Sequence, residues 1–427
     1  MANHDTLLGL ITKLFIFVTL LEDMEIKLYP LLLESTVIRN LEVPVLYDYV
    51  NDELYELDEE AFKVVKLFNG NYSIGEISKI TGFPIKEIEE LTEYLLKENL
   101  LTAKKIKEKT EIADYPQSPI PSLRTILIHL TTSCNLNCVH CYLDKSRKME
   151  MNPKIFIDLV KQFDMLQGLK ILVSGGEPLT HPQFFEMMEK IRKTKVRKVL
   201  LTNGLLLNHE TIQSLKGLVH EIQISLDGTK SHEEFRRMKN AFNLTLNSIK
   251  AAKDNGFTVS VSTMIHRKNL DELPELEKIL KNLKVDNWYL DVPTVTGEYK
   301  NNSAFHLDPY TTGNILKKYG FGKQFYHESE IYACGAHLCA IMANGDVTKC
   351  GFFEEQPVGN IHSKSLRECW GLIREKYLWK QKDLECYKIG CEHLKDCRGG
   401  CRYRAYIETN NLLGIDRVKC SYYGIHP

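Results

Sequence analysis

The chain has 427 residues, 43% hydrophobic and 26% charged, which is an ordinary soluble composition with room for two to four domains. The formal net charge of −1 favours neither a nucleic acid nor a membrane surface as a partner, so we expect neither. Twelve cysteines and no convincing secretion signal indicate metal ligands in a reducing cytoplasm, not disulfides.

Residues 1–23 form an N-terminal extension with two open interpretations. The stretch from Leu7 to Leu21 is mostly apolar, but at about fifteen residues it is too short for a confident membrane span. No basic segment precedes it and no small-residue cleavage site follows it, so a signal peptide is not expected. The extension is either a helix packed on the next domain or mistranslated sequence ahead of a true start at Met24.

Residues 24–103 are expected to form one small domain. Alternating hydrophobic residues indicate two strands, Val43–Val50 and Leu54–Leu57. Cap residues and apolar spacing indicate three helices, over Glu59–Phe68, from Ser73 to Gly82, and over Pro84–Asn99. Strands followed by three helices suggest a winged helix-turn-helix.

Charge argues against DNA binding by this domain. Residues 41–100 hold fourteen Asp or Glu and five Lys, a balance of −9, whereas a phosphate-binding face needs positive charge. The order of elements resembles the PqqD-like peptide-recognition domains, similar to the chaperone of pyrroloquinoline quinone biosynthesis. This resemblance implies that the leader of a precursor peptide adds as a strand to an unpaired edge of Val43–Val50 and Leu54–Leu57. A purely structural cap is the alternative. Residues 104–121, rich in lysine and then proline, are expected to be a linker.

Residues 122–310 alternate strand and helix. Six β-α units favour an α/β fold in which a parallel sheet curls into a partial (β/α)6 barrel of the TIM type, with its ligand at the strand C-termini. Helices are expected between the strands, for example over Pro153–Leu166 and Ala241–Asn255. The predicted strands are Thr125–Leu130, Lys170–Ser174, Lys198–Thr202, Glu221–Leu226, Phe257–Thr263 and Trp288–Val292.

Three cysteines follow the first of these strands at the spacing C-x3-C-x2-C: Cys134, Cys138 and Cys141. Three thiolates can hold a four-iron cluster and leave one iron open for a substrate. The pattern resembles the signature of radical S-adenosylmethionine (SAM) enzymes. That resemblance implies a [4Fe-4S] cluster whose open iron binds SAM, and cleavage of SAM to a 5′-deoxyadenosyl radical. The alternatives are a zinc knuckle short of one ligand or three buried thiols.

Polar motifs at three other strand ends strengthen this resemblance. Leu201-Thr202-Asn203-Gly204 ends the third strand. Gly175, Gly176 and Glu177 end the second strand, where glycine lets the backbone approach a ligand closely. In radical SAM enzymes such a GGEP stretch holds the amino group of SAM, with Glu177 expected to accept from the ammonium. By the same resemblance Ser225, at the end of the fourth strand, contacts the ribose. Arg236, favoured over Arg237, reaches the carboxylate.

Residues 330–427 contain a second cysteine series: Cys334-x4-Cys339, Gly345-x4-Cys350, Cys386-x4-Cys391-x5-Cys397-x3-Cys401 and Cys420. This series resembles the SPASM extension of radical SAM enzymes, which carries two auxiliary [4Fe-4S] clusters. The spacing between Cys386 and Cys391 departs from the usual two residues, and Cys369 fits neither set and is expected to be a buried thiol. Structural zinc is the rival interpretation. The resemblance implies two ligand sets, Cys334, Cys339, Cys350 and Cys401 for one cluster, and Cys386, Cys391, Cys397 and Cys420 for the other.

Together these regions look like a maturase of ribosomally made peptides, most similar to enzymes that join a cysteine sulfur to a carbon in a thioether. The implied partners are a precursor peptide with a leader and a reducing protein such as flavodoxin or ferredoxin. No catalytic protein residue is identified. The alternatives are an anaerobic sulfatase maturase, an enzyme that tailors a porphyrin-type cofactor, and, in another class, a non-catalytic iron–sulfur carrier or peptide-binding scaffold. The sulfatase maturases have an aspartate directly after the cysteine of the G-x4-C motif, where this chain has Gly351.

Overall fold

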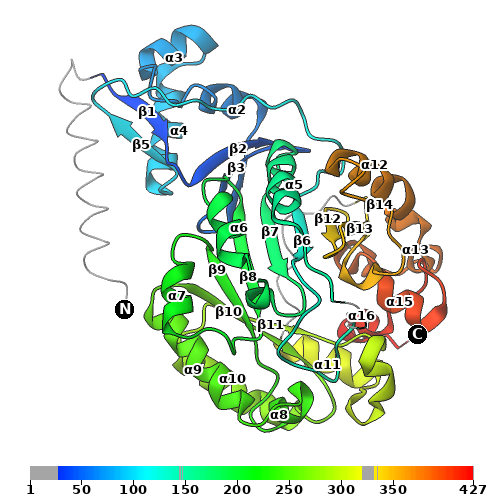
Figure 1. Cartoon of the computed structure of the whole chain (residues 1–427). Coiled ribbons are helices and arrows are strands. Elements are labelled where there is room, and N and C mark those ends of the chain that lie inside the picture. The colour runs from blue at the N-terminus through cyan, green and yellow to red at the C-terminus, as the bar shows by residue number, and fades with distance from the viewer. Residues whose placement is uncertain (1–26, 144–145, 147, 320–330, 334, 427) are drawn as a thin grey trace. The chain divides into compact units, whose positions relative to one another are not determined.

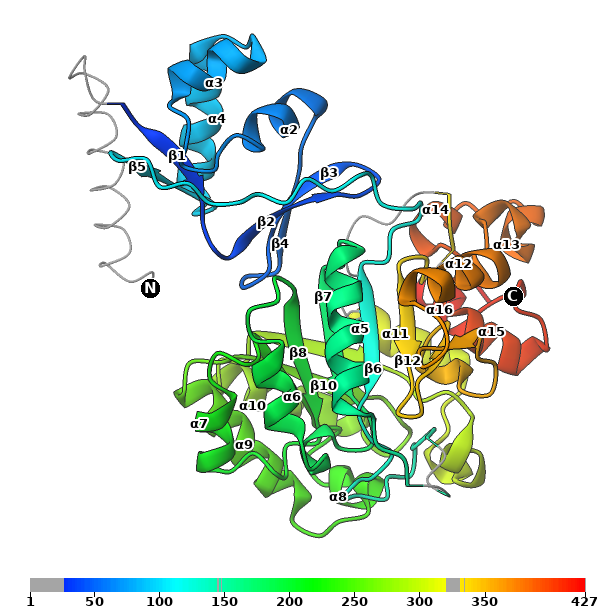
Figure 2. The ribbon, with the colours of Figure 1, turned by 45° about the horizontal axis from the view of Figure 1, so that its top comes forward.

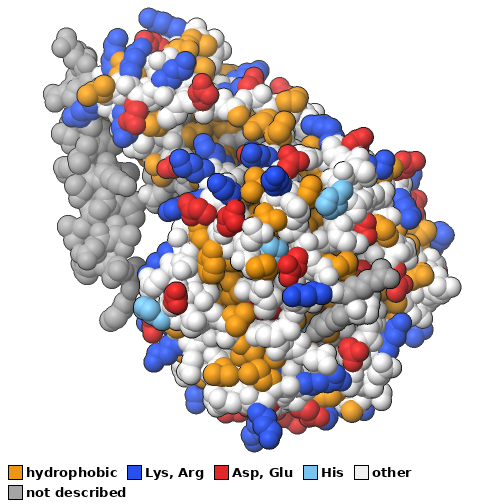
Figure 3. Space-filling view, in the orientation of Figure 1, with side chains coloured by type: hydrophobic (Ala, Val, Ile, Leu, Met, Phe, Trp, Pro, Cys, Tyr) orange, Lys and Arg blue, Asp and Glu red, His pale blue; other side chains and the backbone are white. Residues whose placement is uncertain are grey.

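The structure is a computed structural model that describes residues 27–143, 146, 148–319, 331–333 and 335–426 (Figure 1). The expected extension over residues 1–23 lies outside the described residues. The chain divides into two compact units, Met1–Ser122 and Leu123–Pro427. No helix in the described residues combines the length and apolarity that crossing a membrane requires. On the face shown in Figure 3, basic and acidic side chains are interspersed over the described residues, in keeping with the net charge of −1.

The first unit contains two small antiparallel sheets. Strands β1 (Tyr29–Leu32) and β5 (Leu101–Lys104) form one pair. Strands β2 (Thr36–Asn40), β3 (Pro44–Asp48) and β4 (Glu53–Glu56) form the other sheet in the order β2-β3-β4 (Figure 2). The sequence predicted β3 and β4 but missed the other three strands.

Three helices follow β4, as the sequence predicted: α2 (Glu59–Val65), α3 (Ile74–Thr81) and α4 (Ile85–Lys97). Asp58 caps α2 by accepting from the backbone N–H of Ala61. Ser73 and Glu76 form a capping box at the start of α3, and Gly82 ends that helix in the left-handed conformation at φ 79°. The caps read from the sequence therefore mark these helix ends correctly.

The edges of the second sheet correct one expectation. Strand β3 pairs with β2 on one side and β4 on the other, so the predicted open edge of Val43–Val50 is wrong. Within the described residues, β4 has one strand neighbour. The N–H of Leu57 donates to the carbonyl of Pro44, and in an antiparallel pair the N–H groups point alternately toward the partner and away from it. The N–H groups of Leu54 and Glu56 therefore point away from β3.

The second unit is built on a nine-stranded sheet in the order β11-β10-β9-β8-β7-β6-β12-β13-β14. Six of its strands are parallel and follow one another in chain order, which confirms the six predicted β-α units. Their bounds are β6 (Thr125–His129), β7 (Lys170–Ser174), β8 (Arg197–Thr202), β9 (Glu221–Ser225), β10 (Thr258–Met264) and β11 (Asn287–Asp291).

Three C-terminal strands continue this sheet. Strand β12 (Leu338–Ile341) lies parallel to β6, and β13 (Asp346–Thr348) and β14 (Gly359–Asn360) follow antiparallel. The sheet is thus mixed and larger than the sequence predicted. Since residues 123–427 form one compact unit, the division between an expected core at 122–310 and an expected C-terminal domain at 330–427 stays a prediction.

Helices connect the parallel strands and pack on the sheet around one large apolar core. Those between or directly after the parallel strands are α5 (Pro153–Met165), α6 (Phe184–Lys190), α7 (His209–Leu215), α8 (Ser231–Arg236), α9 (Ala241–Asp254), α10 (Leu273–Asn282) and α11 (Pro309–Tyr319). The C-terminal helices are α12 (Leu366–Tyr377), α13 (Glu385–Lys388), α14 (Leu394–Cys397), α15 (Arg402–Thr409) and α16 (Arg417–Tyr422).

Candidate functional site

A cavity of about 220 Å³ lies at the carboxyl ends of the parallel strands. This is the position that the barrel topology predicts for a ligand. Cys134, Cys138 and Cys141 all line it, from the loop that follows β6. The other strand ends contribute Ser174, Gly175, Gly176, Thr202, Asn203, Gln223, Ser225, Ser262 and Met264, and α8 contributes Arg236.

The two glycines after β7 let two backbone segments come together. Gly175 has φ 139°, and a Cβ atom there would collide with the backbone of Thr131. A Cβ atom on Gly176 would collide with the carbonyl of Ser133. Instead, the N–H of Gly176 donates to the Thr131 carbonyl at 2.7 Å. The sequence predicted close approach to a ligand, whereas the close approach seen here is to the loop that carries the cysteines.

Glu177 is fully buried and is held by the protein itself. Its carboxylate accepts from the Thr202 hydroxyl at 2.9 Å, from the Asn203 N–H at 2.8 Å and from the Leu179 N–H at 3.2 Å. It is not among the residues that line the cavity. The expected bond from Glu177 to a SAM ammonium therefore stays a prediction, and what the structure shows is that this carboxylate fixes the end of β8.

The pKa of Glu177 gives a testable pH dependence. Burial raises it to about 7, against the opposing effect of the three hydrogen bonds. Because the folded protein then holds this proton more tightly than the unfolded chain, the contribution of Glu177 to stability is fully present below about pH 4.5 and is lost as the pH rises through 7. We expect the free energy of unfolding to fall by about 3 kcal/mol relative to Glu177→Gln over this interval. Chemical unfolding of both proteins at several pH values measures this difference, and parallel pH curves would contradict it.

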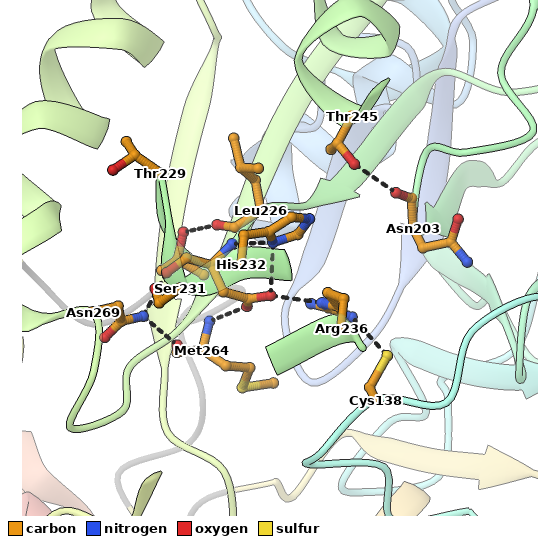
Figure 4. Close-up of polar contacts among 12 residues, drawn as sticks. Cys138, Asn203, Leu226, Thr229, Ser231, His232, Arg236, Thr245, Met264 and Asn269 are labelled. Carbon is orange, nitrogen blue, oxygen red and sulfur yellow. Dashed lines mark hydrogen bonds and ion pairs between the residues drawn. The ribbon is translucent and has the colours of Figure 1, made fainter. Parts of the chain in front are cut away.

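Arg236 lies between the cysteine loop and the end of β9 (Figure 4). Its Nε donates to the Asp227 carboxylate at 2.6 Å, and its Nη1 donates to the Sγ of Cys138 at 3.8 Å. The neighbouring Arg237 instead contacts Glu298 and Asn302, at 3.5 and 3.4 Å. Of the two arginines weighed in the sequence, Arg236 is the one that lines the cavity.

Asn203 holds the other side of the loop. Its amide Nδ2 donates to Asn135 Oδ1 at 2.7 Å and lies 4.0 Å from the Sγ of Cys134. Sequence reasoning gave no role to Asn203 or to Asp227. The available signal was their position, since each directly follows or closely follows a strand whose end meets the cysteine loop at the same edge of the sheet.

The donor set fits a four-iron cluster of the kind that the motif implies. A cubane takes one thiolate from each of three irons, and three thiols line this one cavity, of which Cys138 is only 7% exposed. In the described part of the chain, no three Cys, His, Asp or Glu side chains stand close enough to surround a single metal ion.

Four C-terminal cysteines, Cys386, Cys391, Cys397 and Cys420, interact electrostatically. Burial raises the pKa of Cys420 to about 12, and the thiols of Cys386 and Cys397, the Asp416 carboxylate and the thiol of Cys391 act in the same direction. Within the described residues, no three of them stand close enough to surround a single metal ion. These four are the set expected to hold one auxiliary cluster. The unusual spacing between Cys386 and Cys391 does not separate them, because the short helix α13 and the turn after it bring Cys391 N–H onto the Cys386 carbonyl at 3.0 Å.

The other expected set is brought together only in part. Burial raises the pKa of Cys350 to about 12, and the nearby Cys401 adds to that rise. Cys339 is fully buried in β12, within the same apolar core as Cys369, and Cys369 is the thiol that acts on its pKa. Cys369 is thus a buried core thiol, as expected. Cys334 lies outside the described residues.

Comparison with known proteins identifies the family. Residues 128–298 match the model of the radical SAM superfamily. An AdoMet-dependent heme synthase from Methanosarcina barkeri is 30% identical in an alignment of length 338 that covers 68% of this chain and 94% of the relative. The chain belongs to the radical SAM superfamily. Membership implies a [4Fe-4S] cluster and SAM.

Two further proteins are similar to this chain, one in sequence and one in fold. The antilisterial bacteriocin subtilosin biosynthesis protein AlbA from Bacillus subtilis is 28% identical over 66% of this chain and 67% of the relative. The crystal structure of Streptococcus suis SuiB bound to its precursor peptide SuiA has a TM-score of 0.68, with 19% identity, and covers 91% of this chain and 99% of SuiB. At that identity the likeness to SuiB shows a shared fold.

Proposed function

We propose that this radical SAM enzyme modifies a ribosomally made precursor peptide, forming a thioether between a cysteine sulfur and a carbon of another residue. The observation that carries the proposal is the extent of the fold shared with SuiB, a protein solved with a precursor peptide bound. The second unit makes up about 71% of the chain, so a likeness that covers 91% must also include much of the first unit.

The cavity residues divide between two proposed tasks. Cys134, Cys138 and Cys141 hold the cluster, and the backbone at Gly175 and Gly176, with Glu177, Ser225 and Arg236, binds SAM. When bound, the cluster and SAM supply the radical that takes hydrogen from a carbon of the peptide. The protein itself supports this by tying the GGEP backbone to the cysteine loop, which fixes the two halves of the site against each other.

The C-terminal cysteines are proposed to hold two auxiliary [4Fe-4S] clusters in a SPASM-type region. The grouping of Cys386, Cys391, Cys397 and Cys420 supports the second set. The proximity of Cys350 to Cys401 supports the first, while the position of Cys339 beside Cys369 in the core does not add to it. Forming a thioether removes two hydrogens from the peptide. One would leave as an atom to the 5′-deoxyadenosyl radical and the thiol hydrogen as a proton, which leaves one electron over. Clusters held by these cysteines would supply an acceptor for that electron, with a flavodoxin or ferredoxin as the partner.

The first unit is proposed to bind the leader as a PqqD-like domain of winged helix-turn-helix type. Its strand β4 has one neighbour within the described residues, and two of its N–H groups point away from β3. An extended peptide can add there by main-chain hydrogen bonds. This assigns edge pairing to β4 alone, since β3 is paired on both sides.

Porphyrin chemistry is the second candidate function. It is favoured by the heme synthase relative, whose identity of 30% over nearly its whole length is higher than that of AlbA. That relative matches 68% of this chain, however, which leaves about a third without a counterpart. A heme-type reaction gives the first unit no task, whereas the peptide proposal assigns it the binding of a leader.

The residue after Cys350 argues against an anaerobic sulfatase maturase, because it is Gly351 and not the aspartate of that family. A Cβ atom on Gly351 would lie 2.8 Å from the Tyr142 hydroxyl oxygen and 3.2 Å from Leu127 Cδ2. The Tyr142 ring is itself held against Phe352, with ring centroids 4.9 Å apart. The place of the expected aspartate is therefore filled, and the side chain that fills it comes from the cysteine loop.

The experiment that tests the function compares substrates on one enzyme preparation. The full-length protein, reconstituted with iron and sulfide without oxygen, is incubated with SAM, a reductant and a cysteine-containing precursor peptide with its leader, or with a porphyrin precursor of heme. We expect the peptide to lose two hydrogens by mass spectrometry and to lose one alkylatable thiol. Conversion of the porphyrin alone would establish the heme-type alternative. Absence of 5′-deoxyadenosine with every substrate would favour a non-catalytic carrier.

A further inference from the structure

Asp227 is fixed by more contacts than its ion pair with Arg236 requires. The carboxylate is fully buried, and its second oxygen accepts from the backbone N–H of Met264 at 3.0 Å. Its own backbone N–H donates to His232 Nδ1 at 3.1 Å, and its carbonyl accepts from the Asn269 side chain. These contacts come from Met264 of β10, His232 and Arg236 of α8, and Asn269 of the loop after β10, all of which Figure 4 labels. The carboxylate therefore offers Arg236 a single fixed position.

The guanidinium of Arg236 lies next to one of the three thiols, that of Cys138. The arginine is 7% exposed, and so is Cys138, whose sulfur receives the Nη1 donor. A charge in such a water-poor setting acts more strongly on its neighbours than one at the surface. The thiol of Cys134, by contrast, is approached by the neutral amide of Asn203. The loop thus has a cation on one of its sulfurs and an uncharged donor near another.

We propose that Asp227 is a positioning residue that fixes Arg236 against Cys138, and that this cation raises the reduction potential of the cluster held by the cysteine loop. Hydrogen bonds and charge at the sulfur ligands are among the features that set such potentials. A reduced cluster carries one more negative charge, so a cation beside a ligand sulfur stabilises the reduced form. The inference rests on the cluster implied by family membership and is independent of the peptide substrate.

This role differs from the contact with SAM that the sequence suggests for the same arginine. Nε and Nη1 are committed to Asp227 and Cys138. Nη2 is the guanidinium nitrogen not engaged in these two contacts, so it is the one left for a carboxylate. Measurements made without SAM separate the two roles, because only the contact with Cys138 acts on the cluster when SAM is absent.

The test is a redox titration of the full-length, reconstituted protein without SAM, followed by electron paramagnetic resonance. The signal of this cluster is assigned by its disappearance when Cys134, Cys138 and Cys141 are all alanine. For Arg236→Gln we expect the ratio of reduced to oxidised cluster at a fixed potential to fall about tenfold, which is 59 mV for a one-electron couple. Arg236→Lys keeps a charge without the planar fork and should shift less, in the same direction.

Arg237→Gln is the matched control. It removes the same charge from the next residue, whose side chain is exposed and contacts Glu298 and Asn302. Its cluster should titrate as in the unmodified protein. A shift as large as that of Arg236→Gln would show a general effect of charge and would overturn the inference.

Asp227→Asn tests the positioning role by the sign of its effect. An amide cannot accept from both Arg236 and the Met264 N–H with its two terminal atoms, so the guanidinium should leave Cys138 and the potential should fall. If Arg236 stayed in place, loss of a negative charge nearby would raise the potential instead. A rise would therefore overturn the assignment of Asp227.

If a variant loses its cluster, no potential can be measured, and the iron content of the variants then tests the proposal. Loss from Arg236→Gln but not from Arg236→Lys would support the need for a cation at Cys138. Loss from both would show that charge is not the property required, and an unchanged potential in Arg236→Gln with full iron would show that the contact has no electronic effect. Either of these last two results overturns the proposal.

Discussion

Replacing Cys134, Cys138 and Cys141 together with alanine is expected to stop SAM cleavage completely and to remove about four irons per chain. The three thiols line one cavity, and no other described cysteine lines it, so the site has no substitute ligands there. The two proposed C-terminal sets should keep about eight irons. Iron analysis and release of 5′-deoxyadenosine after reconstitution measure both effects.

Cys369→Ala is the control for this experiment. It removes a fully buried thiol that packs in the apolar core, so it should cost stability without removing iron. Stoichiometric zinc in the freshly purified protein, or SAM cleavage that survives the triple substitution, would contradict the assignment of the cysteine loop.

Removing the first unit is expected to separate SAM cleavage from peptide modification. A chain that begins at Pro121 retains the entire second unit, so it should keep its clusters and cleave SAM slowly. Without a bound leader the peptide must find the active site unaided, and modification at micromolar peptide should fall about a hundredfold. The measurement is the yield of modified full-length precursor by mass spectrometry, at equal iron content.

A single substitution in the full-length chain makes the same point without truncation. Glu56→Pro removes an N–H that points away from β3, so the β3–β4 pairing survives while the edge loses a donor. Glu56→Pro should lower modification of the full-length precursor and should leave modification of a peptide without the leader unchanged. Glu56→Ala keeps the N–H, so it should leave modification of both peptides unchanged. Equal yields from Glu56→Pro and Glu56→Ala, or tight binding of duplex DNA by residues 24–103, would show that β4 is not where a leader pairs.

The elements that the sequence predicted well are those with local signals. Lys170–Ser174 was placed to the residue because an apolar run ends at a glycine pair, and Ser73 and Gly82 bound α3 as read. Strands β1, β5 and β12 were missed because they are four residues long and gain their stability from partners far along the chain. Local periodicity contains no information about such pairings.

The site shows the same division. The cysteine spacing and the strand-end motifs predicted which segments meet at the cavity, and they do meet. The contacts of individual side chains could not be predicted. Glu177 turns toward Thr202 and Asn203, and Asp227 anchors Arg236, because hydrogen bonds formed on folding decide where each buried carboxylate points. The ligand role of Cys339 stays a prediction, and its place in β12 within the apolar core could not be predicted from the cysteine spacing.

The pairing of β12 with β6 has a consequence for how the protein is made and how it should be dissected. Ile126 lies next to Cys339 in the sheet. Strand β6 can therefore pair with β12 only after about two hundred further residues have been synthesised. Until then the strand that leads into the cysteine loop presents an open edge, which is prone to pairing with other chains. Deleting the C-terminal region would recreate that edge permanently. Point substitutions of the C-terminal cysteines are therefore the better way to test their proposed metal centres, because they leave β12 in place beside β6.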